Sequence, residues 1–186
     1  ITLTGETLTI NELKDILYGN KKVSVANESI EKVRSSRKTI EKIVQADKSV
    51  YGINTGFGKF SNMKIQNEHV TELQLNLIRS HACGVGEPFS AKVVKAMMVL
   101  RLNALIKGYS GVRLEVIQLL TQFINKNIIP VIPQQGSLGA SGDLAPLAHL
   151  ALALIGEGEV FNDTGQIVPT IEMLEKHQLQ PITLQE

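Results

Sequence analysis

A chain of 186 residues is long enough to form one domain with a sizeable hydrophobic core. Its 43% apolar residues, 20% charged residues and net charge of +1 are ordinary for a globular protein and indicate neither a nucleic-acid partner nor a membrane partner. The sequence has no apolar run of membrane-spanning length, no basic-then-apolar secretion signal and a single cysteine, Cys83, a combination typical of a cytoplasmic protein without disulfides.

The first third of the chain predicts a short strand and two helices. The strand covers residues 2–4, and the first helix begins after Thr9 and ends at Gly19. Asn27 opens a longer amphipathic helix, whose apolar residues share one face while charged residues occupy the other. The apolar face carries Ile30, Val33, Ile40, Ile43 and Val44.

Residues 51–62 interrupt the helical pattern with three glycines and predict a loop. The residues alone leave two interpretations open: a surface connection, or a lid that carries Tyr51 over a site. A nucleotide-binding loop is excluded, because neither Gly-x-x-x-x-Gly-Lys nor Gly-x-Gly-x-x-Gly is present.

Helices are predicted again at about residues 67–80, 90–107 and 112–126, and Cys83 is interpreted as a packing residue. The predicted core face of the second of these helices consists of Val93, Val94, Met97, Met98, Leu100 and Leu105, and that of the third consists of Val116, Ile117, Leu120, Phe123 and Ile124. In residues 128–133 two prolines exclude a helix and a central strand, which leaves an extended buried segment.

The last part of the chain predicts a buried helix, a hairpin and a short helix. The buried helix begins after Asp143 and ends at Gly156, and His149 lies in it as a satisfied interior residue. Residues 159–161 and 166–168 form the hairpin, and residues 170–177 the short helix.

Residues 136–143 are the stretch with the most unusual chemistry. Three glycines surround Ala140 and Ser141, and a helix N-terminus follows directly. The nitrogen of Gly142 could attack the carbonyl of Ala140 and close a five-membered ring, and loss of water from Ser141 would complete a methylidene-imidazolone, an electron-poor alkene. By itself Gly-Ala-Ser-Gly is an ordinary turn, and Asp143 stands where a serine-hydrolase elbow would need glycine.

Three motifs, in their order and separations, resemble the aromatic amino acid ammonia-lyase family. Residues 139–149 resemble the family's main signature, residues 51–58 its second and residues 80–86 its third. The resemblance covers essentially the whole chain. It implies a mainly α fold with minor β hairpins: residues 1–186 would be a single N-terminal domain of the fumarase/aspartase-like ammonia-lyase fold, truncated before the long central helix bundle, in a homotetramer.

The resemblance also implies the prosthetic group and its chemistry. Ala140, Ser141 and Gly142 match the residues that form the methylidene-imidazolone autocatalytically, and Asp143 matches a residue that helps the backbone cyclise. No metal and no external cofactor is expected. Tyr51 matches the catalytic tyrosine that removes the β-proton of the substrate.

The substrate is implied by the third motif. Gly58, Ser80 and His81 match substrate-binding positions, and a Ser-His pair at 80–81 is typical of members that convert L-histidine to trans-urocanate and ammonia. A histidine can exchange a hydrogen bond with an imidazole substrate, which makes the match chemically sensible.

Two alternatives remain open. One is a phenylalanine or tyrosine ammonia-lyase or aminomutase, which Phe-Leu at residues 80–81 would have favoured; the other is a non-catalytic helical domain that only associates. Because the family's remaining active-site residues lie beyond Glu186, the isolated chain is expected to be inactive and its ring closure impaired.

Overall fold

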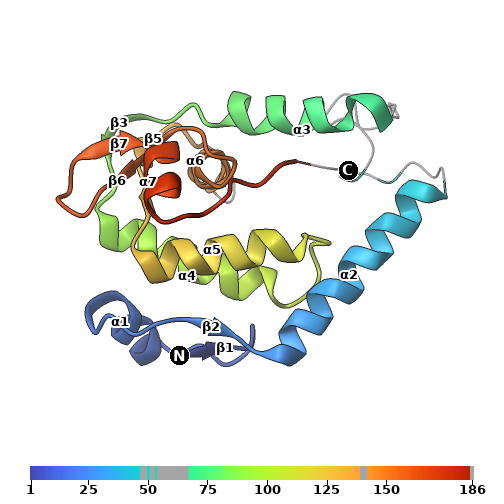
Figure 1. The fold of residues 1–186 in the computed structure, drawn as a ribbon, viewed down its shortest axis with the longest axis horizontal. Coiled ribbons are helices and arrows are strands. Elements are labelled where there is room, and N and C mark those ends of the chain that lie inside the picture. The colour runs from blue at the N-terminus through green and yellow to red at the C-terminus, as the bar shows by residue number, and fades with distance from the viewer. Residues whose placement is uncertain (47–49, 51–52, 54–66, 139–141, 185–186) are drawn as a thin grey trace.

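The computed structural model describes residues 1–46, 50, 53, 67–138 and 142–184, and confirms a mainly helical fold with minor β structure (Figure 1). Its helices are α1 (Ile10–Tyr18), α2 (Asn27–Gln45), α3 (Asn67–His81), α4 (Ala91–Leu105), α5 (Leu114–Lys126), α6 (Leu144–Leu154) and α7 (Thr170–Lys176). Its strands are β1 (Thr2–Leu3), β2 (Ser24–Val25), β3 (Val85–Pro88), β4 (Ile129–Pro130), β5 (Pro133–Gln135), β6 (Glu159–Phe161) and β7 (Ile167–Pro169).

The elements stack in layers. In Figure 1, α1 with β1 and β2 lies along one edge, α4 and α5 form the middle layer, α6 and α7 lie on the other side of it, and α3 runs along the opposite edge. Contacts link α1 to α4, α4 to α5, α5 to α6 and α6 to α3, while α2 runs along one side and touches α5. None of the helices in the described ranges is both long and apolar enough to span a membrane.

The hydrophobic core is centred on the middle layer. The α5 residues predicted to be buried include Ile117, Leu120, Phe123 and Ile124, and all four are at most 1% exposed. For α4 the predicted face is partly wrong, because Val93 and Leu100 are each 51% exposed while Val99 and Leu102 are fully buried. Apolar residues lie on most sides of α4, so periodicity could not choose the face; contacts with α1, α5 and β4 choose it instead.

The strands are short and pair across long stretches of sequence. β1 pairs with β2 in parallel, and β6 joins β4 and β7 in a three-stranded antiparallel sheet, which confirms the predicted hairpin. Pro130 lies on the edge strand of that sheet, in agreement with its exclusion from a central strand. β3 and β5 pair antiparallel, with Val85 opposite Gln135 and Pro88 opposite Pro133. The sequence did not predict this last pair, which brings residues 85–88 beside residues 133–135.

Helix ends agree closely with the sequence where local signals are strong. Thr9 and Glu12 form a reciprocal capping box at the start of α1, and Gly19 ends the helix. Asn127, in a left-handed backbone conformation with φ of 53°, ends α5.

Candidate functional site

The structure describes part of the predicted site. Tyr51, Gly58, Ala140 and Ser141 lie outside the described residues, as does the predicted loop over most of 51–62. Of the ring-forming stretch, Gly142 and Asp143 are described, and both are exposed. Gly142 has a φ of +66°, and a Cβ built on it meets no atom within 4 Å. Backbone conformation, rather than crowding, is therefore the physical reason for glycine at this position.

Asp143 occupies the N-cap position of α6, as predicted, but its side chain makes no capping hydrogen bond. Its backbone is already close to helical, with φ of −110° and ψ of −3°, whereas a capping side chain needs an extended residue. The amide of Ala145 instead donates to the hydroxyl of Ser137 at 3.4 Å. The side chain of Ser137 thus lies against the first turn of α6, at the positive end of the helix dipole.

Ser80 and His81 form the C-terminal end of α3. The Nδ1 atom of His81 lies 2.8 Å from the carbonyl oxygen of Leu77, and Ser80 Oγ lies 3.0 Å from the same oxygen. A carbonyl accepts hydrogen bonds only, so Nδ1 of His81 carries the proton and a neutral ring keeps Nε2 as an acceptor. His81 is half-buried and Ser80 is exposed. Ser80 Oγ also lies 3.1 Å from His81 Nδ1, and a hydroxyl that donates to a carbonyl keeps its acceptor lone pairs, so both side chains retain an acceptor for a ligand.

His149 links the third motif to α6. Its Nε2 atom accepts a hydrogen bond of 3.0 Å from the amide of Gly84, which confirms His149 as a satisfied, partly buried residue. Burial lowers the pKa of His149 and so favours the neutral ring that this bond requires. A Cβ at Gly84 would lie 2.9 Å from His149 Nε2, so the close approach needs glycine.

A second glycine contact joins the same two segments. Gly136 has a φ of +135°, and a Cβ on it would lie 2.8 Å from the Cα of Gly84. Together with the pairing of β3 and β5, this contact places the end of α3 beside the start of the ring-forming stretch. The structure therefore places the segment that follows Ser80 and His81 beside residues 133–136, through groups 45 or more positions apart.

The prediction that Cys83 is a packing residue is wrong. Its side chain is exposed, not packed, because it lies in the turn between α3 and β3. Near the same turn, Arg79 forms a two-pronged ion pair with Glu157, with distances of 3.0 and 2.5 Å. The Arg79 guanidinium lowers the pKa of Glu157 and ties α3 to the segment after α6.

Sequence reasoning missed Ser137 and the link made by His149. The partners of these side chains lie eight and 65 positions away, beyond the reach of local patterns. Among the residues that the structure describes, no three His, Cys, Asp or Glu side chains are arranged to hold a metal ion.

Comparison with known proteins matches residues 8–186 to the model of the family "Aromatic amino acid lyase". A curated histidine ammonia-lyase of Bacillus subtilis (strain 168) is 56% identical over 184 residues, which are 99% of this chain and 36% of the relative. The chain thus spans about a third of the length of that relative.

Two solved structures extend the likeness to the fold. The ergothionase of Treponema denticola, described as an ergothioneine-degrading enzyme, superposes with a TM-score of 0.94 at 31% identity, over 100% of this chain and 37% of that one. A histidine ammonia-lyase of Trypanosoma cruzi gives a TM-score of 0.89 at 38% identity, over 99% of this chain and 35% of that one. With the family match over residues 8–186, the chain belongs to the aromatic amino acid lyase family.

Proposed function

We propose that this chain is the N-terminal domain of a histidine ammonia-lyase, which converts L-histidine to trans-urocanate and ammonia. The observation that carries the proposal is the contact between the end of α3, with Ser80 and His81, and the segment that leads into residues 136–143. The likeness to the histidine ammonia-lyase of Bacillus subtilis, at 56% identity, supports histidine over phenylalanine or tyrosine as substrate.

The described residues fit a methylidene-imidazolone made from Ala140, Ser141 and Gly142. Gly142 has the left-handed backbone that a tight turn needs, and a Cβ built on it would meet no atom within 4 Å. Asp143 does not cap α6 with its side chain, and although the amide of Ala145 is bonded to Ser137, the positive end of the α6 dipole at this point would favour negative charge developing on the group. The group would supply an electrophilic alkene that takes up the amino group of the substrate. No external cofactor enters this proposal.

The side chains of this domain would bind the substrate and move its proton. Nε2 of neutral His81 accepts a hydrogen bond from the N–H of the substrate imidazole, while its Nδ1–H is held by Leu77. Gly58, in the second motif, would be a further substrate-binding residue, as the family resemblance implies. Tyr51 removes the β-proton, which requires donors or positive charge around its phenol, because a free phenol has a pKa of about 10.

The complete enzyme would be a cytoplasmic homotetramer, and the domain alone would be inactive. The matched relative is nearly three times as long, and this chain covers 36% of it. A substrate held by only part of a site loses the precise orientation on which catalysis depends.

A chimaera tests the proposed substrate. Residues 1–186 replace the matched 184 residues of the Bacillus subtilis relative, and the product urocanate is followed by its absorbance. We expect deamination of L-histidine and not of L-phenylalanine or L-tyrosine. His81→Leu should lower kcat/KM for histidine by about tenfold or more, whereas exposed Lys14→Gln should not change it. Preference of the chimaera for an aromatic substrate without imidazole would overturn the proposal.

A further inference from the structure

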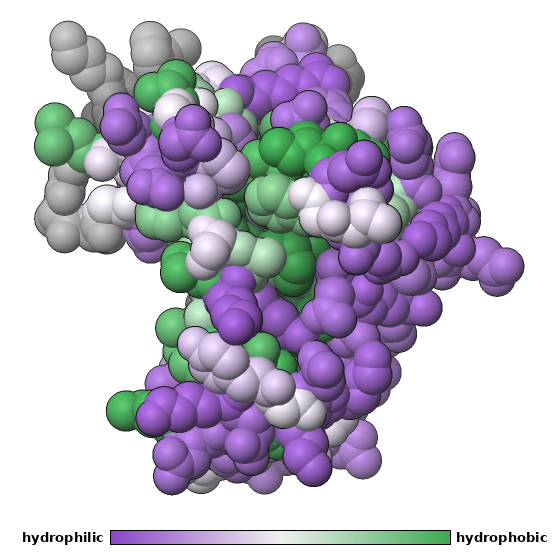
Figure 2. Space-filling model, turned by 90° about the vertical axis from the view of Figure 1, so that its left-hand side faces the viewer, coloured by the Kyte–Doolittle hydropathy of each residue, from purple (hydrophilic) through white to green (hydrophobic). Residues whose placement is uncertain are grey.

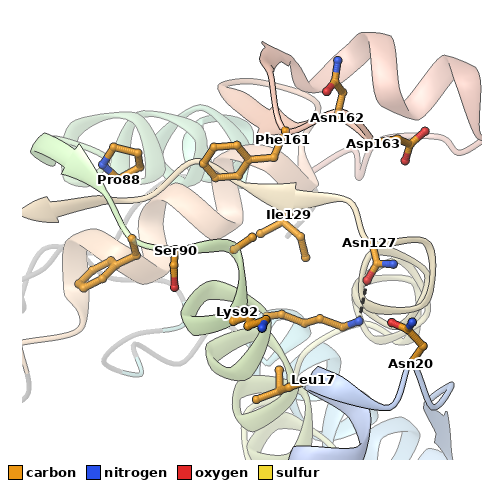
Figure 3. Close-up of a pocket in the computed structure, with 14 residues that line it drawn as sticks. Leu17, Asn20, Pro88, Ser90, Lys92, Asn127, Ile129, Phe161, Asn162 and Asp163 are labelled. Carbon is orange, nitrogen blue, oxygen red and sulfur yellow. Dashed lines mark hydrogen bonds between the residues drawn. The ribbon is translucent and has the colours of Figure 1, made fainter.

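A pocket lies away from the region of Ser80, His81 and residues 136–138. Its volume is about 570 Å³, within the range of small-ligand sites. It opens between the end of α1, the start of α4, the end of α5 and the β6–β7 hairpin (Figure 3). Figure 2 shows this side of the molecule, where apolar surface gathers around a hollow bordered by polar residues. Its described lining includes none of residues 80–81, 136–138 and 142–143.

A buried ammonium group lines this pocket. Lys95 is 8% exposed, and its Nζ donates a 2.6 Å hydrogen bond to the side-chain oxygen of Asn127 (Figure 3, dashed line). Within the described part of the chain, Lys95 has no carboxylate partner. A buried charge is normally paired, because a single neutral partner does not replace the water that it loses. Burial and the nearby charge of Lys22 lower the pKa of Lys95.

Other groups at the pocket also favour a negative charge. Ser90, Ala91 and Lys92 line it at the start of the 15-residue helix α4, where no side chain caps the free amides. Among the described residues that line the pocket, Asp163 is the acidic one, and its carboxylate is bound to Lys176 at 2.6 Å. The partial negative charge at the C-terminal end of α5 stabilises the positive charge of Lys95. It does not explain the open space beside Lys95.

The opposite side of the pocket is apolar. Phe89, Ile129 and Phe161 line it, and Figure 3 shows Ile129 and Phe161 on the side of the pocket away from Leu17 and Lys92. A ligand that satisfies both sides has one anionic group and an apolar body.

We propose that this pocket binds a small organic carboxylate, with its carboxylate at Lys95 and the start of α4 and its apolar body against Phe89 and Phe161. The inference does not depend on the proposed reaction, since the described residues of the two sites do not overlap.

Calorimetric titration with hexanoate tests the proposal on the 186-residue chain and on the chimaera. We expect hexanoate to bind both proteins and hexanol, its neutral counterpart, to bind at least about tenfold more weakly, since a charge-assisted hydrogen bond contributes that much. Lys95→Met should raise the Kd for hexanoate by about tenfold or more. Lys14→Met, at an exposed position on α1, is the matched control and should leave the Kd unchanged.

Further measurements keep the test decisive. If Lys95→Met does not fold, Lys92→Met replaces an exposed residue at the same pocket and should also raise the Kd. Three results would overturn the proposal: no binding of hexanoate, equal binding of inorganic phosphate, which would make the apolar wall irrelevant, or binding by the 186-residue chain that is absent in the chimaera, which would mean that other protein segments fill the pocket.

Discussion

The helices α5 and α3 have similar lengths but very different burial. α5 contributes five buried side chains to the core: Ile117, Leu119, Leu120, Phe123 and Ile124. In α3, whose side chains are described from residue 71 onward, none is fully buried, and the inward residues Leu73, Leu77 and Ile78 are half-buried. α3 packs against α6 and ends in Ser80 and His81. α5 is thus part of the hydrophobic core, whereas α3, which carries the proposed substrate residues, packs against α6 with described side chains that are at most half-buried.

This difference predicts unequal local stability. Segments with few buried apolar contacts open more readily than the core of the same domain. Substitutions in the two helices, and in the contacts that hold the end of α3, measure how strongly α3 and the proposed site are coupled to the hydrophobic core around α5.

Matched leucine truncations should give the largest difference. Leu120→Ala removes a side chain that is 1% exposed and should lower the free energy of unfolding by about 2–5 kcal/mol. Leu77→Ala removes a half-buried side chain and should cost less than about 1.5 kcal/mol, because it loses less buried area and leaves no closed cavity. Urea denaturation checks both, and equal losses would show that α3 is as much part of the core as α5.

Gly84→Ala should have the next largest effect. A Cβ there meets His149 Nε2 at 2.9 Å and Pro133 Cβ at 3.1 Å, and such overpacking costs about 1–3 kcal/mol. Gly165→Ala is the control, because its Cβ meets nothing within 4 Å and only its φ of +81° is strained. Amide hydrogen exchange should show faster opening of α3 in Gly84→Ala but not in Gly165→Ala. Unchanged exchange in α3 would contradict the proposed link.

The bond between Gly84 and His149 predicts a pH dependence. Because burial lowers the pKa of His149 in the folded state, the unfolded state binds its proton more readily, and stability rises with pH. The contribution is fully present above the unfolded pKa of about 6.5 and is lost as pH falls through the folded pKa. It should amount to about 1 kcal/mol, the net value of one hydrogen bond.

His149→Gln should reduce the loss of stability between about pH 7.5 and about pH 5.5, measured by urea denaturation. His177, whose pKa burial also lowers, remains in both proteins and cancels in the comparison. Identical pH profiles of the two proteins would mean that protonation of His149 does not change the free energy of unfolding.

The ion pair between Arg79 and Glu157 should matter least. Both side chains are largely in contact with water, with exposed fractions of 51% and 37%. Water and salt screen such pairs, so Arg79→Ala should leave the urea midpoint of the domain nearly unchanged. A large fall in the midpoint would show that this pair, rather than β3, β5 and His149, holds α3 in place.

Local signals predicted the elements well. The capping box at Thr9, the glycine at 19 and the prolines of residues 128–133 each act over a few residues, and the structure has the expected boundaries there. The direction of burial was less predictable in α4, where Val93 and Leu100 are exposed, because an apolar surface on most sides leaves the choice to the neighbouring helices.

The candidate site was predictable as motifs but not as an arrangement. The motifs predicted roles for Gly142, Asp143, Ser80 and His81, yet the pairing of β3 with β5 and the bond from Gly84 to His149 join residues 45 or more positions apart. Such contacts depend on tertiary packing. The exposed Cys83 lies in the turn that leads into this long-range pairing of residues 85–88 with residues 133–135.

The central claim is that Ser141 becomes part of the electrophile that drives deamination. The most direct test is the rate of urocanate formation by the chimaera with Ser141→Ala. The account predicts that this rate falls by about three orders of magnitude or more while the protein stays folded. A chimaera that deaminated L-histidine at an unchanged rate with alanine at this position would contradict it.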